Sequence, residues 1–372
     1  MTFELLRGGA LAPRAGLLHL PHGTIETPAF MPVGTRGTVK AIDMRDLSAL
    51  QPGMVLANTY HLWRAPGHQA VARAGGLHRW TGWTGNFLTD SGGYQVVSLA
   101  RVGRARVEEE GVVFDGGARL TPEDAVRVQE ALAPDVMMAL DQPVGFPASP
   151  EATAEATWRT HRWAERCRAA WSRGPTELWG IVQGGFDLFL RKESSLALRE
   201  LDLPGYAIGG LSLGEPSAAS SDCLEECTNL LPSDRPRYLM GVGTEREMLA
   251  AIAAGVDLFD CVWPTRLART GAALVGAGRI NLVSSRFADQ FGPLEPGCGC
   301  PACARHTRAE IRHLLRRGEL LGYRLLTMHN LHHSLELTRG ARRAVLEGSF
   351  AEFTVRRLAA LPSPGGREDR PI

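Results

Sequence analysis

Short apolar runs that end abruptly at a polar or glycine residue recur along this chain and constrain its fold more than any other feature. Each run is about five residues long, is bounded by turn-forming residues and is followed by a helical pattern, which indicates a strand buried on both faces. The runs end at Asn58, Asp90, Asp141, Gln183, Gly209–Gly210, Gly241, Asp260 and His329. Eight strands that alternate with helices predict a (β/α)8 barrel, whose active site lies at the carboxyl ends of the strands. The acids and amides at those ends are therefore expected to converge on one pocket.

The positive charge of the chain is concentrated in one segment, although the net charge is only +1. From Cys261 to Arg343 there are 13 arginines, no lysine and five acidic residues, which leaves a local excess of eight positive charges. A basic region on an otherwise acidic protein is expected of a surface that binds a phosphate backbone. Solvated helix faces would explain the same charge equally well.

Three of the seven cysteines form a C-x-C-x2-C cluster: Cys298, Cys300 and Cys303. An odd number of cysteines argues against a disulfide framework. The tight spacing is instead typical of a zinc knuckle, in which a fourth ligand closes a tetrahedral structural site. Spacing alone does not choose among the candidates for that ligand: His306, His329, His332 and His333. Three reduced thiols without a metal are the alternative interpretation.

The chain of 372 residues exceeds the roughly 250 of a plain barrel, so additions to one large domain are expected. We predict a single barrel domain over residues 1–360, with a β-rich cap before the barrel and a zinc-binding subdomain at about 270–330 inserted before the last barrel strand. Residues 361–372 are expected to be a disordered tail. No run approaches the ~20 apolar residues of a membrane span, and the first residues do not resemble a signal peptide. These observations predict a cytoplasmic protein without a membrane partner.

Five segments resemble, in order and spacing, the bacterial tRNA-guanine transglycosylases, which are also called queuine tRNA-ribosyltransferases. They are FLTDSGGYQVVSL, GIVQGG, GVDLFDCVWPTR, the cysteine cluster and LLTMHN. The resemblance extends from TPAFMPVGTRGTVKA to HNLHHSLEL, which is nearly the whole chain. It implies a (β/α)8 barrel with a zinc-bearing insertion, His329 as the fourth zinc ligand, and a homodimer.

The resemblance also implies a reaction of the queuosine pathway. Guanine at the wobble position of tRNAs with a GUN anticodon is exchanged for a 7-deazaguanine base, preQ1 or queuine, with preQ1 favoured. Breaking an N-glycosidic bond with retention requires a nucleophile and an acid/base group. By resemblance, Asp260 is the nucleophile that forms a covalent ribosyl-enzyme intermediate, and Asp90 is the general acid/base.

The same resemblance assigns the residues that hold the base and the tRNA. Asp141 accepts from the amino edge of the base, while Gln183 and the backbone N–H of Gly210 donate to its carbonyl. Tyr94 and Met240 stack on the two faces of the ring. The remaining candidates are Ser91 and Leu211 in the base pocket and Arg266 and Arg269 at tRNA phosphates.

Taken singly, these residues also fit a purely structural role. An aspartate after a strand often caps the next helix, and an isolated tyrosine or methionine is more often a core residue. The chain also departs from the bacterial pattern at Gln142, Pro143 and Leu213, which are expected to border the substituent at the 7-position of the base. The choice among preQ1, its nitrile precursor and queuine therefore stays open.

Two other classes of protein use part of this residue set. A retaining glycosidase or nucleoside deoxyribosyltransferase would use the same carboxylates on free sugars or nucleosides, but the basic segment and the zinc knuckle would then have no purpose. A non-catalytic tRNA-binding subunit is the other alternative, and the presence of both Asp90 and Asp260 argues against it.

Overall fold

Eight parallel strands form a barrel in which the order of the strands in space follows their order in the chain. The computed structural model describes residues 1–100, 102–211 and 217–362. The barrel strands are β4 (Ala29–Pro32), β5 (Met54–Ala57), β6 (Asn86–Thr89), β10 (Val136–Met138), β11 (Glu177–Val182), β12 (Tyr206–Ile208), β13 (Arg237–Leu239) and β14 (Leu258–Cys261). A parallel bridge between Val33 and Leu56 joins the first two strands, and the N–H of Gly34 donates to the carbonyl of Leu56 at 2.7 Å. The predicted (β/α)8 fold is confirmed.

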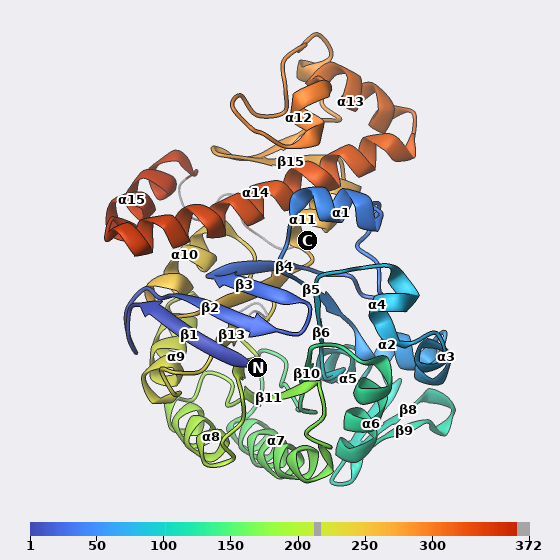
Figure 1. Cartoon of the computed structure of the whole chain (residues 1–372), viewed down its shortest axis with the longest axis vertical. Coiled ribbons are helices and arrows are strands. Elements are labelled where there is room, and N and C mark those ends of the chain that lie inside the picture. The colour runs from blue at the N-terminus through green and yellow to red at the C-terminus, as the bar shows by residue number, and fades with distance from the viewer. Residues whose placement is uncertain (101, 212–216, 363–372) are drawn as a thin grey trace.

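Helices follow the strands and cover the outside of the barrel (Figure 1). They are α1 (Met44–Leu50), α2 (Thr59–Arg64), α3 (His68–Arg73), α4 (Gly76–Thr81), α5 (Gly93–Ala100), α6 (Pro122–Leu132), α7 (Pro150–Ala170), α8 (Leu188–Glu200), α9 (Ser217–Leu230) and α10 (Glu245–Ala253). Capping residues fix where some of these helices begin. Thr121 and Asp124 form a capping box at the start of α6, as do Thr244 and Glu247 at the start of α10, and such boxes satisfy N–H groups that a helix leaves free.

An antiparallel sheet closes the amino end of the barrel. It consists of β1 (Thr2–Arg7), β2 (Ala15–Leu20) and β3 (Gly23–Thr27), in the region predicted to be a β-rich cap. Leu18 and Ile25 of this sheet belong to one buried cluster with Met138 and Trp179 from the barrel strands. Because apolar side chains fill this end, the carboxyl ends of the strands are the open face.

The prediction that the eighth strand ends at His329 is wrong. The run LLTMHN lies inside α14 (Leu320–Glu347), a helix of 28 residues, and β4 provides the missing strand. A short apolar run does not by itself distinguish a buried strand from a turn of a buried helix. Here Leu331 and Leu335 continue the buried stripe at helical spacing. The short strand β4 follows Pro28 and ends at Pro32, in the region that the sequence assigns to the cap.

The predicted insertion consequently follows the last barrel strand instead of preceding it. It contains α11 (Trp263–Arg269), β15 (Ala272–Val275), β16 (Gly278–Asn281), η2 (Ser285–Phe287), α12 (Pro301–Arg305) and α13 (Arg308–Arg316). Figure 1 shows α14 lying between the barrel and the outer part of this insertion. A small separate core that includes Phe287, Leu294 and Ile311 holds the insertion against α14.

The other additions are a small sheet and a final helix. The sheet contains β7 (Ala105–Glu108), β8 (Gly111–Phe114) and β9 (Arg119–Leu120), with η1 (Asp115–Gly117) before β9, and the last helix is α15 (Phe350–Ala360). Within the described residues, every helix is too short or too polar to serve as a membrane span. The predicted tail falls almost wholly outside the described residues, as does Leu213.

Candidate active site and metal centre

Asp90 lies directly after β6 and is held by donors from the neighbouring strand–helix connection and from its own loop. The N–H groups of Thr59 and Gly92 donate to its Oδ1 at 2.9 and 3.2 Å, and Nδ2 of Asn58 donates to its Oδ2 at 2.5 Å. Burial raises the pKa of Asp90 to about 7, and the negative charges of Asp260 and Asp141 act in the same direction. A carboxyl group with this pKa can both give and take a proton near neutrality.

Asp260 is part of β14 and faces a donor from the neighbouring strand. The hydroxyl of Tyr238 donates to its Oδ1 at 2.5 Å, and the N–H of Gly241 donates to the same oxygen at 2.8 Å. Burial raises the pKa of Asp260, whereas these two hydrogen bonds favour the ionised form and oppose that rise. Burial also raises the pKa of Tyr238 well above its usual range, so its hydroxyl remains a donor. The arrangement stabilises a carboxylate in a poorly solvated position.

Three of the residues predicted to hold the base form one hydrogen-bonded group. The hydroxyl of Ser91 donates to Oδ1 of Asp141 at 2.6 Å, and Nε2 of Gln183 donates to its Oδ2 at 2.7 Å. Burial raises the pKa of Asp141, and both hydrogen bonds oppose this. A Cβ on Gly93 would lie 2.1 Å from Oδ1 of Asp141, so only glycine fits there. This group lies beside Asp90, whose pKa responds to the charge of Asp141.

Gly210 lies against the side chain of Gln183. A Cβ on Gly210 would come within 2.7 Å of Oε1 of Gln183, and its φ of +74° also favours glycine. Leu211 follows as a buried residue. The structure therefore places Gly210 next to the Asp141 group, as the sequence predicted.

Tyr94 and Met240, the residues predicted to stack on the base, both lie near the open face of the barrel. Tyr94 lies in the first turn of α5 and is 61% exposed, whereas Met240 follows β13 and packs against the cluster inside the barrel. Their roles remain predictions. Of the departures from the family pattern, Gln142 accepts a hydrogen bond from Arg159 of α7 at 2.7 Å, and Pro143 is buried.

The predicted tRNA-binding arginines lie on α11, immediately after the strand that carries Asp260. Arg269 is exposed and Arg266 is half-buried. The helix α11 follows β14 directly, so both arginines lie near the open face of the barrel. This position is compatible with contact to a tRNA phosphate.

The cysteine cluster and His329 form a group that could hold a metal ion. The Sγ atoms of Cys298, Cys300 and Cys303 lie 3.7, 3.5 and 3.4 Å from Nδ1 of His329. Zinc bonds of about 2.3 Å to sulfur and about 2.0–2.1 Å to nitrogen at tetrahedral angles would separate these atoms by about 3.6 Å. Nε2 of His329 lies 2.6 Å from the carbonyl of Leu274, so an N–H there leaves Nδ1 free to bind the metal. The donor set and its dimensions are compatible with zinc.

Two of the other candidates for the fourth ligand pair with acidic residues instead. His306 pairs with Glu310 at 2.9 Å, and His333 lies 3.5 and 3.7 Å from Glu245 and Glu295. His332 lies within hydrogen-bond reach of Cys298, but it is not one of the four residues whose ligand atoms all lie within 4.8 Å of one another. The structure therefore selects His329, although from a helix and not from the end of a strand.

A second group of possible ligands, His22, His78 and Asp135, is less suited to a metal. The two imidazole rings are stacked, with centroids 3.5 Å apart and an angle of 15° between the planes. A ring nitrogen binds a metal in the plane of its ring, and two nearly parallel planes at this separation do not share one ion. Both rings instead approach the carboxylate of Asp135, at 2.7 and 3.2 Å.

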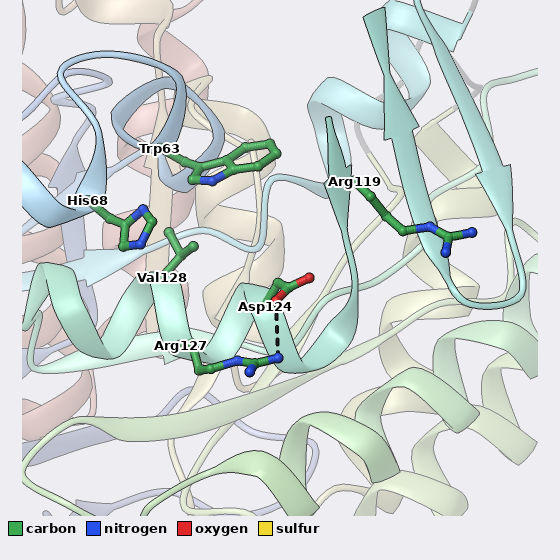
Figure 2. A pocket seen from close by; sticks show the side chains of 6 residues that line it. All are labelled: Trp63, His68, Arg119, Asp124, Arg127 and Val128. Atoms are coloured by element: carbon green, nitrogen blue, oxygen red, sulfur yellow. Dashed lines mark hydrogen bonds and ion pairs between the residues drawn. The ribbon is translucent and has the colours of Figure 1, made fainter. Parts of the chain in front are cut away.

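Figure 2 shows a surface pocket of about 300 Å³ that is lined by Trp63, His68, Arg119, Asp124, Arg127 and Val128. None of the predicted site residues lines this pocket. Its two arginines are already paired, Arg127 with Asp124 at 3.1 Å and Arg119 with Glu108 at 2.5 Å. The predicted site residues lie at the open face of the barrel and not in this pocket.

Several polar residues that organise this face were not predicted from the sequence. In the sequence, Asn58 marks only the end of a strand, and Tyr238 is part of an apolar run. The period of two along a strand places Tyr238 on the same side as Met240, so its position could have been found. Arg191 of α8 is also fully buried and donates to the carbonyl of Gly185 at 2.9 Å. It gave no such signal, because a single arginine in a helix usually faces solvent.

The chain is a (β/α)8 barrel with two poorly solvated carboxyl groups at its open face, a third that is hydrogen-bonded to Ser91 and Gln183, and a Cys3His group that could hold a metal ion. In this fold, the open face is where enzymes carry their active sites. Comparison with known proteins then identifies the family. The chain belongs to the queuine tRNA-ribosyltransferase family, whose model matches residues 10–363.

Curated relatives that carry the name queuine tRNA-ribosyltransferase are similar over nearly the whole chain. The protein of Desulforudis audaxviator (strain MP104C) is 49% identical over 371 residues, which cover 98% of this chain and 99% of the relative. That of Synechococcus sp. (strain CC9902) is 51% identical over 91% of this chain and 92% of the relative. That of Pelotomaculum thermopropionicum is 49% identical over 91% of this chain and 93% of the relative.

Proposed function

We propose that this protein is a tRNA-guanine transglycosylase that replaces guanine at the wobble position of tRNAs with a GUN anticodon by a 7-deazaguanine base, with preQ1 preferred. The observation that carries the proposal is the pair of carboxyl groups at the open face. Asp260 is held as a carboxylate by two donors, while Asp90 has a pKa of about 7. These are the properties required of a nucleophile and of an acid/base group.

The reaction proceeds by two displacements at C1′ of the ribose. An oxygen of Asp260 forms a bond to C1′ as the C1′–N9 bond breaks, and the electron pair of that bond leaves with guanine. Protonated Asp90 supplies a proton to the departing base and becomes a carboxylate. The incoming base then gives its N9 proton to Asp90, and its N9 displaces Asp260 from C1′, which restores both residues and retains the configuration.

The base is recognised through its polar edge. Asp141 accepts from the N1–H and amino group, while Gln183 and the N–H of Gly210 donate to the carbonyl. The Gln183 amide carries two N–H donors, so one can hold Asp141 at 2.7 Å while the other donates to the base. Ser91 and Leu211 complete this pocket, and Tyr94 and Met240 stack on the ring.

The metal is a structural Zn2+, one per subunit. Cys298, Cys300, Cys303 and His329 supply four protein ligands, which leaves no open position for substrate or water. Zinc joins the cysteine-bearing loop to α14 and so supports the basic insertion that contacts tRNA. Arg266 and Arg269 bind tRNA phosphates, the enzyme acts as a homodimer, and its tRNA substrate supports a cytoplasmic location.

The test is incorporation of radiolabelled guanine into unmodified tRNA by the purified protein. Asp260→Asn is expected to abolish incorporation, because an amide is a far weaker nucleophile. Asp202→Asn is the matched control, since Asp202 is an exposed acid whose side chain retains 78% of its accessible surface. Competition by preQ1 and queuine then reports the preferred base, and tRNAs without a GUN anticodon report specificity. No incorporation by folded, zinc-loaded wild-type protein would refute the proposal.

A further inference from the structure

Arg191 is a fully buried arginine on α8 whose guanidinium binds main-chain carbonyl groups next to the base pocket. Its Nε donates to the carbonyl of Gly185 at 2.9 Å. Its Nη1 donates to the carbonyls of Val182 and Gly209 at 3.1 and 2.8 Å. Arginine is almost never fully buried unless its charge is compensated, and here the compensating groups are main-chain carbonyls beside Gln183 and Gly210.

Two of these carbonyls belong to the peptide units that precede the predicted base-recognition residues. A trans peptide is planar, and its C=O and N–H point in opposite directions. The carbonyl of Gly209 shares its peptide unit with the N–H of Gly210. A hydrogen bond from Arg191 to that carbonyl therefore directs the N–H of Gly210 away from Arg191, towards the side on which the base would bind.

The peptide before Gln183 is fixed in the same way. Its carbonyl, from Val182, accepts from Arg191, and its N–H donates to the hydroxyl of Ser194 at 3.1 Å. The Gly209–Gly210 unit needs such support more, because two consecutive glycines rotate freely. Nη2 of Arg191 also lies close to this peptide unit, 3.5 Å from where a Cβ on Gly210 would be.

We propose that Arg191 is a positioning residue for base recognition, which orients and polarises the N–H of Gly210 as a donor to the carbonyl oxygen of a purine base. A charged donor on the carbonyl of a peptide draws electron density from it and strengthens its N–H as a donor. The inference rests on the proposed function, because it assumes that the base carbonyl binds at Gly210. It assigns selectivity for a 6-oxo purine to a residue that does not touch the base.

A purely structural role makes a different prediction, and the chain contains a matched case. Arg237 is also fully buried, and it donates to the carbonyls of Ala10, Gly255 and Leu231 at 2.7, 3.4 and 2.8 Å. It lies at the start of β13, at the closed end of the barrel. Its replacement should lower stability without changing how the base is selected.

The experiment compares the affinities of guanine and 2-aminopurine for wild type, Arg191→Lys and Arg237→Lys. 2-Aminopurine lacks both the carbonyl oxygen and the N1 hydrogen; Asp141, which accepts from N1–H, is the same in all three proteins, so a change in the preference between the two bases reports on the carbonyl contact. Lysine keeps the charge but cannot bind three carbonyls in the geometry of a guanidinium. Arg191→Lys is expected to reduce the preference for guanine over 2-aminopurine at least tenfold. Arg237→Lys is expected to keep the wild-type preference, even if it lowers the melting temperature as much as Arg191→Lys does. Arg191→Gln is a second variant, expected to behave like Arg191→Lys.

An unchanged preference in a folded Arg191 variant, while wild type exchanges guanine in tRNA, overturns this inference and leaves the proposed function intact. Failure of both Arg191 variants to fold, with Arg237→Lys folded, assigns Arg191 to barrel stability and also overturns it. Absence of exchange by wild-type protein refutes the proposed function itself.

Discussion

Replacing Tyr238 by phenylalanine removes one of the two donors that stabilise the Asp260 carboxylate and leaves the ring in place. The lost hydrogen bond is 2.5 Å long, and the N–H of Gly241 at 2.8 Å remains. Hydrogen bonds to charged groups contribute about 1.5–3 kcal/mol. Ionising Asp260 should become less favourable by that free energy, so the pKa of Asp260 should rise in the variant.

The size of the kinetic effect depends on pH in a defined direction. Where Asp260 is mostly protonated in both proteins, the variant should react about 10- to 150-fold more slowly, because about 1.4 kcal/mol corresponds to a factor of ten. Where Asp260 is ionised in both proteins, the hydrogen bond no longer limits the amount of nucleophile. The two rates should therefore converge as the pH rises.

The assay is the single-turnover rate at which the covalent tRNA–enzyme adduct forms, measured on denaturing gels from about pH 5 to about pH 8. Tyr206→Phe is the matched control. Tyr206 is buried at the start of the neighbouring strand β12, and its hydroxyl accepts a hydrogen bond from the N–H of Leu203 at 3.2 Å. It is remote from Asp90 and Asp260, which lie at the other end of the strands. Adduct formation by Tyr238→Phe that is as fast as that of wild type at every pH at which both proteins are folded would refute the role of Tyr238 in ionising Asp260.

The geometry supports four further predictions. The pKa of about 7 at Asp90 predicts that adduct formation slows as the pH rises through 7, because the departing guanine then finds the acid deprotonated; a rate that keeps rising to about pH 9 contradicts this assignment. Cys300→Ser should lose the bound zinc and lower the melting temperature, whereas His306→Ala should retain one zinc per chain by atomic absorption, since His306 pairs with Glu310. Gly93→Ala would place a Cβ 2.1 Å from Oδ1 of Asp141 and should weaken guanine binding by about 5- to 150-fold, the value of a displaced buried hydrogen bond; Gly9→Ala, where a Cβ meets nothing within 4 Å, is the control, and equal affinities would count against the Asp141 pocket. Arg266→Ala should weaken tRNA binding and reduce the slope of log affinity against log salt concentration by about 0.7–0.9 for one lost phosphate contact. A slope equal to that of wild type would exclude that contact.

The part of the fold that the sequence predicted rests on short-range patterns. Seven of the eight expected strand ends lie within three residues of the end of a barrel strand, because buried parallel strands are short apolar runs bounded by turn signals. The capping boxes at Thr121 and Thr244 are equally local, because each joins residues only three apart in the chain. The prediction of a strand that ends at His329 was wrong, because a short apolar run within a long helix resembles a strand when its neighbours are not considered.

The grouping of Asp141, Ser91 and Gln183 followed from the same reasoning. Residues at the carboxyl ends of parallel strands must meet at one face, whatever the detailed packing. Their distances could not be predicted, since these depend on glycines such as Gly93 that allow the side chains to approach.

The sequence by itself determined the barrel, the carboxylates at its open face and the cysteine cluster, because strand periodicity, turn residues and ligand spacing act over a few neighbouring positions. Only the tertiary structure decided which segment closes the barrel and which donors surround Asp90 and Asp260. It also decided that Arg191 is buried against the peptide units that precede Gln183 and Gly210. The physical reason is that burial and hydrogen-bond partners depend on contacts between segments far apart in the chain, such as Val182 and Gly209, and no local pattern encodes these contacts.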